Sequence, residues 1–120
     1  MAMELITTER HDNVSHVRLR GALDIAGIRE IDTRFYGETS ARDRPAIVDL
    51  SELDAITSLG IGMLFGCAKS LQSKGHRMVL LQPRGLVDDV LRRVGVHEVI
   101  PFAASLDEAL KIAREGPRRT

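Results

Sequence analysis

The feature that most constrains this fold is an alternation between short apolar runs and longer amphipathic segments. Residues 46–50 and 78–81 are rich in branched apolar side chains, which is typical of strands buried on both faces. Each run is followed by a segment with helical periodicity. A helix between two strands carries the chain back across the sheet, so that the strands can pair in parallel. The alternation therefore predicts an α/β domain.

The N-terminal region predicts a hairpin instead. Apolar and polar residues alternate over residues 3–9 and 14–20, as in half-buried strands, and the turn-forming sequence His11-Asp12-Asn13 separates them. Gly21 is expected to end the second strand. A last short strand is expected at residues 96–100. The whole pattern is a mixed β-sheet in which an opening hairpin precedes alternating strands and helices.

About four helices should pack on this sheet, and local signals mark their ends. Asp24 is a candidate N-cap, Ser105 begins a Ser-Leu-Asp-Glu capping box, and Gly95 is a candidate C-terminal stop. The apolar positions expected to face the core are Ile25, Ile28, Ile31 and Phe35; Ile61, Leu64, Phe65, Ala68 and Leu71; Val87, Val90, Leu91 and Val94; and Ala109, Leu110 and Ala113.

Composition limits the function classes. The 17 basic and 17 acidic side chains cancel, so no long-range field favours nucleic acid or an acidic membrane surface as partner. The single cysteine, Cys67, excludes an intrachain disulfide, and no two histidines have the i, i+4 spacing of a metal site. Neither a signal-peptide pattern nor a run of about 18 apolar residues is present. We therefore expect one cytoplasmic domain over residues 1–120 that needs no cofactor or metal.

The sequence Thr57-Ser58-Leu59-Gly60-Ile61-Gly62 follows a buried strand and an expected loop at residues 51–57, and it opens a helix that ends before Gly75. Ligands and partners of α/β sheets bind where strands end and helices begin. A helix N-terminus there can hold an anion, including a phosphate on its own serine, and glycines leave its N–H groups uncovered. The alternative is structural: Ser58 or Thr57 caps the helix, and Gly62 and Gly66 let it lie close to the sheet.

Catalytic alternatives fit the sequence poorly. The glycines from Gly60 onward follow the third strand, and their spacing is one residue too long for a dinucleotide loop. A nucleophile elbow at Ser58 would lack its first glycine, and His76 and His97 have no evident acidic partner. Asp49 stands near the position of a receiver aspartate, but the acidic pair after the first strand is missing, so we expect a polar strand end. The sequence does not indicate an enzyme.

Three segments carry a family resemblance: Gly21-Ala22-Leu23-Asp24, Ile47-Val48-Asp49-Leu50-Ser51 and Ile56-Thr57-Ser58-Leu59-Gly60-Ile61-Gly62. Together they resemble a STAS domain over about residues 3–113, and more narrowly the bacterial anti-sigma-factor antagonists. The resemblance implies a binding switch. Its partner would be an anti-sigma factor with a serine-kinase, histidine-kinase-like ATPase fold, and docking would release a sigma factor.

The resemblance also implies residue roles. Ser58 stands at the phosphoacceptor position, where the partner's kinase activity would switch binding off and a metal-dependent phosphatase would restore it. The implied partner-binding residues are Asp24, Thr57, Ser58, Leu59, Gly60, Ile61, Gly62 and Met63. Thr57 and Leu59 replace the aspartate and serine that most of these antagonists carry. Thr57 is therefore an alternative acceptor, and a phosphorylation-independent scaffold or transport-associated regulatory subunit stays open as the alternative function.

Overall fold

The computed structural model describes residues 3–7 and 13–116. Its elements, in chain order, are β1 (Glu4–Thr7), β2 (Ser15–Leu23), α1 (Ile25–Glu38), β3 (Ala46–Ile56), α2 (Ser58–Ser73), β4 (Met78–Leu81), α3 (Gly85–Val94), a 3₁₀ helix η1 (Val96–Glu98), β5 (Phe102–Ala103) and α4 (Leu106–Arg114). None of the described helices combines the length and apolarity that a bilayer crossing requires.

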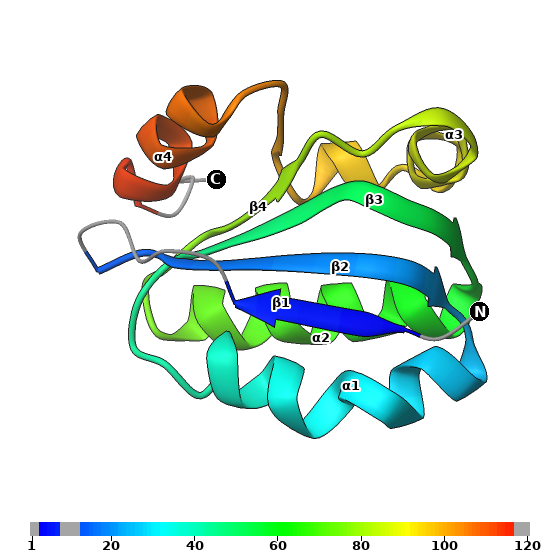
Figure 1. Cartoon of the computed structure of the whole chain (residues 1–120). Helices are drawn as coiled ribbons and strands as arrows, with labels where there is room; N and C mark the ends of the chain where they lie inside the picture. Colours follow the sequence, from blue (N-terminus) through cyan, green and yellow to red (C-terminus); the bar gives the residue numbers. More distant parts are fainter. Residues whose placement is uncertain (1–2, 8–12, 117–120) are drawn as a thin grey trace.

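The five strands form one mixed sheet in the order β1-β2-β3-β4-β5. β1 pairs with β2 antiparallel, and every later neighbour pairs in parallel, which confirms the predicted opening hairpin followed by crossovers. Residues 8–12, which include most of the expected hairpin turn, lie outside the described residues. Helices α1 and α2 lie on one side of the sheet and α4 lies on the other (Figure 1).

The side chains of the central strands alternate between two apolar clusters. Val48 and Leu80 belong to the larger cluster with α1 and α2, whereas Ile47 and Val79 belong to the smaller cluster with α4. All four side chains are fully buried or nearly so. The short apolar runs of the sequence follow from this arrangement, since helices cover both faces of the sheet at residues 46–50 and 78–81, where every position is buried.

Two predicted strand ends are wrong. β2 does not stop at Gly21 but continues to Leu23, and the register of β2 with β3 shifts beside Gly21, whose φ is 110°. A glycine at a bulge can adopt this φ without ending the strand. β3 likewise runs through residues 51–56, which were expected to be a loop, because Glu52 to Ile56 pair with the extended end of β2.

The predicted strand at residues 96–100 is also wrong. Gly95 takes a left-handed conformation as the C-cap of α3, as expected, but the chain then turns into η1. Only the two residues of β5, Phe102 and Ala103, pair with β4. Consecutive 3₁₀ hydrogen bonds, from Glu98 N to Gly95 O and from Val99 N to Val96 O, satisfy the backbone that a strand would have paired.

The helix starts are those that the caps predict. The Asp24 carboxylate accepts a hydrogen bond from the Gly27 N–H at 2.8 Å, and the Ser105 hydroxyl accepts one from the Glu108 N–H at 3.2 Å. Two apolar positions do not face the core: Ile25 is 54% exposed and Val94 is 59% exposed. They are the first residue of α1 and the last residue of α3, where little of the fold covers a helix end.

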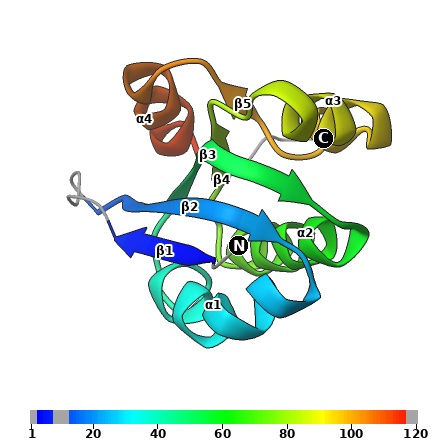
Figure 2. The same ribbon diagram turned by 45° about the vertical axis from the view of Figure 1, so that its right-hand side comes forward.

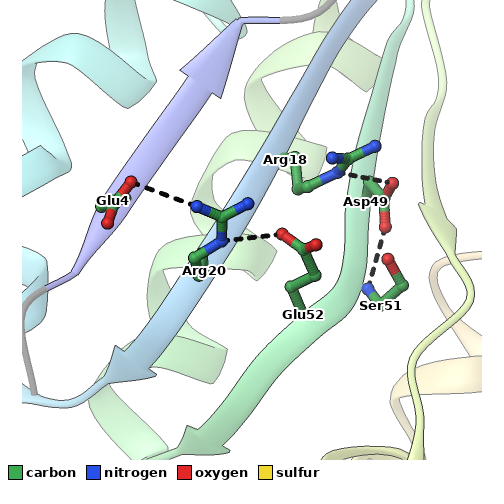
Figure 3. A network of polar contacts seen from close by, with 6 residues as sticks. All are labelled: Glu4, Arg18, Arg20, Asp49, Ser51 and Glu52. Atoms are coloured by element: carbon green, nitrogen blue, oxygen red, sulfur yellow. Dashed lines mark hydrogen bonds and ion pairs between the residues drawn. The ribbon is translucent and has the colours of Figure 1, made fainter.

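Charged side chains form a ladder across β1, β2 and β3 (Figure 3). Arg20 pairs with Glu52 at 2.9 Å and with Glu4 at 3.5 Å, and the hydrogen bond and charge of Glu52 raise the pKa of the Arg20 guanidinium above its ordinary value. Arg18 pairs with Asp49 at 3.2 Å. Asp49 is therefore a buried, mid-strand partner of an arginine and not the polar strand end that we expected.

Candidate functional site

The candidate site lies where β2 and β3 end and α1 and α2 begin. Leu23 and Ile56 are register partners at the carboxyl ends of the two strands, and each is followed by the N-cap of a helix. These helix starts lie at one edge of the sheet, at the right of Figure 1, and Figure 2 shows the same edge from another side. The sequence around Ser58 is thus held by paired strands up to the residue before the N-cap.

Thr57 is the N-cap of α2, which settles which hydroxyl caps the helix. Its Oγ1 accepts a hydrogen bond from the Gly60 N–H at 3.4 Å and donates one to the Leu23 carbonyl at 3.1 Å. The Thr57 backbone N–H donates to the same carbonyl at 3.1 Å. The Thr57 hydroxyl is therefore engaged as both donor and acceptor, and it joins the start of α2 to the end of β2.

Ser58 is the first residue of α2 and its side chain is exposed. None of the polar contacts recorded among the described residues involves its hydroxyl. The first N–H groups of a helix have no intrahelical acceptor, and Thr57 satisfies that of Gly60 but not those of Ser58 and Leu59. A free hydroxyl thus stands beside two free donors at the positive end of a helix dipole.

Asp24 occupies the equivalent place on the neighbouring helix. Its carboxylate caps α1 through the Gly27 N–H, and its carbonyl accepts the Ile28 N–H at 2.8 Å. Asp24 directly follows Leu23, the residue to which Thr57 is bonded. The two caps therefore flank one carbonyl group, although no contact among the described residues joins Asp24 to Ser58.

Gly60, not Gly62 or Gly66, allows the close approach of α2 to the sheet. A Cβ added at Gly60 would lie 2.7 Å from the Leu23 carbonyl oxygen and 2.9 Å from Leu23 Cγ. Around Gly62 there is nothing within 4 Å, and at Gly66 the nearest atom is the Tyr36 hydroxyl at 3.8 Å. The expectation that Gly62 and Gly66 bring the helix to the sheet is wrong, because both face solvent.

The predicted partner-binding residues divide into two sets. Ile61 and Met63 are only 7% and 9% exposed and pack in the core with Gly60, whereas Leu59 is 57% exposed. Two further exposed apolar side chains lie at helix starts at this end of the sheet: Ile25, which the helical periodicity assigns to the core, and Leu86, which is 68% exposed near the start of α3. Their signal was an apolar residue within the first two positions of a helix that follows a strand.

The other histidine and cysteine side chains considered in the sequence lie away from Ser58. His76 does have an acidic partner, contrary to expectation, since its Nε2 lies 2.7 Å from Asp43 Oδ1. It follows the end of α2, about 20 Å along the helix from Ser58 at ~1.5 Å per residue. Cys67 is buried, its thiol donates to Thr39 Oγ1 at 3.1 Å, and burial raises its pKa. In the described part of the chain, no three His, Cys, Asp or Glu residues are placed to hold a metal ion.

Comparison with known proteins identifies relatives at low identity. The model of the STAS domain family matches residues 6–109. The Bordetella bronchiseptica protein BtrV, named as a candidate anti-sigma factor antagonist, is 24% identical over 104 residues, which cover 87% of this chain and 90% of BtrV.

Two solved structures share the fold. An anti-sigma factor antagonist from Mycobacterium paratuberculosis superposes with a TM-score of 0.78 at 22% identity, covering 92% of this chain and 95% of that one. Unphosphorylated SpoIIAA, the Bacillus anti-sigma factor antagonist, superposes with a TM-score of 0.67 at 21% identity, covering 92% and 98%.

Proposed function

The chain belongs to the STAS domain family, which is non-enzymatic, and from this premise we propose that it is an anti-sigma-factor antagonist switched off by phosphorylation of Ser58. The observation that carries the proposal is that two neighbouring hydroxyls differ in their hydrogen bonding. The Thr57 hydroxyl both donates and accepts a hydrogen bond at the helix start. Ser58 is exposed, and its hydroxyl makes no hydrogen bond to a described residue. A kinase can reach Ser58 without breaking a contact of the fold.

The same geometry favours Ser58 over Thr57 as acceptor. A phosphate on Thr57 would remove the donor that bonds the Leu23 carbonyl at 3.1 Å and would disturb the joint between α2 and β2. A phosphate on Ser58 would add about two negative charges beside the free N–H groups of the first turn. The helix dipole stabilises an anion there by about 0.3–1 kcal/mol, so the fold should tolerate the modification.

The docking surface would consist of exposed apolar side chains at the same end of the sheet as that serine. Leu59 is adjacent to Ser58, and Ile25 and Leu86 stand at the starts of α1 and α3 on the same edge of the sheet (Figure 1). Exposed apolar side chains of this kind commonly form the desolvated centre of a protein–protein interface. A phosphate in the middle of such a contact must be desolvated without a prepared counter-charge, which weakens the complex.

The proposed partner is an anti-sigma factor with a serine-kinase, histidine-kinase-like ATPase fold, which releases its sigma factor when this chain binds. That partner would phosphorylate Ser58 with ATP, and a metal-dependent phosphatase would reverse the modification. Because the anti-sigma factor and its sigma factor act with the transcription machinery, this chain would work in the cytoplasm. It would make no nucleic-acid or membrane contacts of its own.

The test uses purified anti-sigma factors of this fold from the source organism and titration calorimetry. We expect a complex with the wild type and with Ser58→Ala, and about 100-fold weaker binding by Ser58→Asp, equivalent to about 2.8 kcal/mol. With ATP, mass spectrometry should locate phosphate on Ser58 in the wild type and no phosphate in Ser58→Ala. Unchanged binding by Ser58→Asp would rule out the switch.

A pair of apolar variants tests the surface independently of the phosphate. Leu59→Ala should weaken the complex at least tenfold, because Leu59 lies beside Ser58. Val94→Ala is the matched control, since Val94 is 59% exposed but lies at the far end of α3. Equal effects of the two variants would place the partner elsewhere. A complex that forms regardless of Ser58 would favour the alternative, a phosphorylation-independent scaffold or transport-associated subunit.

A further inference from the structure

A cavity of about 390 Å³ lies beside α2, away from the proposed docking surface. Its lining comes from residues 65–72 of α2, residues 76–78 at the start of β4, and residues 97–101. At ~1.5 Å rise per residue, the lining begins about 10 Å along the helix from Ser58. Cavities of about 300–1,000 Å³ are the size class of small-molecule sites. We call this space the α2 cavity.

The α2 cavity exists because the last strand is short. β5 pairs only with Leu80 and Leu81, so the first half of β4 has no strand beside it on that side. The residues that could have extended β5 instead form η1 and a bend in which Val99 is 67% exposed. The outer side of α2 is consequently left open at Phe65, which is only partly buried.

Backbone hydrogen bonds hold the walls of this cavity in place. The Arg77 carbonyl accepts the Ala46 N–H at 3.0 Å, and the Pro101 carbonyl accepts the Leu80 N–H at 3.0 Å. The His76 N–H donates to the Leu71 carbonyl at 2.9 Å, which closes the end of α2. Each wall is thus tied to the sheet or to the helix, and a ligand would meet a preformed site.

The lining combines an apolar floor with cationic side chains. Phe65 and Val99 supply accessible apolar surface, and the buried side chains of Met78 and Ile100 lie beneath it. Lys69 and Arg77 supply two positive charges, and no described residue gives either side chain an ion pair or hydrogen bond.

Two imidazoles and one carboxylate complete the polar lining. His76 is held by Asp43 at 2.7 Å, and His97 packs edge-on against Phe102, with ring centroids 6.1 Å apart. Among the described residues that line the cavity, Glu98 is the only acidic one. The balance of fixed charge is therefore positive, which complements an anion.

We propose that the α2 cavity binds a small amphipathic organic anion. The apolar body of the ligand lies against Phe65 and Val99, and its anionic group faces Lys69 and Arg77. A planar apolar body suits the Phe65 ring, and a carboxylate, sulfonate or phosphate group suits two unpaired cations. The site is separate from Ser58, so this ligand is a second class of partner and not part of the phosphorylation switch.

The test uses 8-anilinonaphthalene-1-sulfonate as the probe and amide NMR of the full chain as the readout. The probe should shift amides of residues 65–72, 76–78 and 97–101, with saturable binding. The double variant Lys69→Gln/Arg77→Gln should weaken binding at least fivefold. The matched control is Arg29→Gln/Lys111→Gln, which removes the same charge from exposed residues outside the cavity and should bind like the wild type.

An uncharged probe of the same shape, N-phenyl-1-naphthylamine, separates the anion from its apolar body. It should bind at least fivefold more weakly than the sulfonate. The proposal is overturned if the shifted amides cluster elsewhere, if both double variants lose binding equally, or if the two probes bind alike. Absence of saturable shifts with the sulfonate would also overturn it. Because binding is measured on the isolated chain, failure here leaves the proposed Ser58 switch unaffected.

Discussion

Three glycines that look alike in the sequence should respond in opposite directions to alanine. Gly62 lies in the interior of α2 with nothing within 4 Å of an added Cβ. Gly62→Ala therefore adds helix propensity without a clash and should stabilise the fold by about 0.5–1 kcal/mol. Gly60→Ala gains the same propensity, but its Cβ would stand 2.7 Å from the Leu23 carbonyl oxygen. The overpacking costs about 1–3 kcal/mol, so the net effect is a loss of up to about 2 kcal/mol.

Gly27→Ala should be the most damaging of the three. Its Cβ would lie 2.1 Å from the Ala22 carbonyl oxygen and 3.2 Å from Met3 Cβ, and the backbone oxygen cannot turn aside as a flexible side chain can. Unfolding entropy of about 2.1 cal/mol/K per residue makes 1 kcal/mol equivalent to about 4 °C in a chain of 120 residues. Calorimetry should thus place Gly62→Ala about 2–4 °C above the wild type, Gly60→Ala below it and Gly27→Ala lowest. A Gly60→Ala variant at least as stable as Gly62→Ala would refute this account of how α2 meets the sheet.

Three further predictions concern single contacts. Asp49→Ala leaves Arg18 unpaired and removes the 2.8 Å bond that Asp49 accepts from the Ser51 N–H, so urea unfolding should show a loss of about 2–3 kcal/mol; Asp49→Asn, which can keep the second bond, should lose about 1 kcal/mol. Burial raises the pKa of Cys67, so the folded state resists thiolate formation. The free energy of unfolding should therefore fall as pH rises beyond the ordinary thiol pKa. At pH 8 a disulfide reagent should label Cys67 only after the protein unfolds. Ser105→Ala removes the cap of α4 and should lower the free energy of unfolding by about 1 kcal/mol in the same urea assay. Ser105→Asp can still cap the helix and should retain most of the wild-type stability.

Local chemistry made much of the fold predictable from the sequence. Asp24 and Ser105 mark helix starts because a capping side chain satisfies N–H groups within three residues of itself. The run at residues 78–81 identified β4 with its observed ends, because a strand covered on both faces must be apolar throughout. Ser58 was placed at the start of α2 by the same kind of local signal.

What the sequence missed depends on neighbours that are distant along the chain. Residues 51–56 are polar enough to suggest a loop, yet they form the end of β3 because the extended end of β2 offers them hydrogen bonds. Residues 96–100 are apolar enough for a strand, but the chain turns into η1 and leaves the α2 cavity beside it.

The sequence by itself determined the order of elements, the helix starts and the presence of a serine at the head of α2, because caps and periodicity act over one or two turns. Only the tertiary structure decided that Thr57 is committed to the Leu23 carbonyl while Ser58 is exposed, and that Gly60 and not Gly62 touches the sheet. Both outcomes depend on how closely α2 approaches the end of β2. That distance is set by the packing of two strands and a helix, which no local pattern encodes.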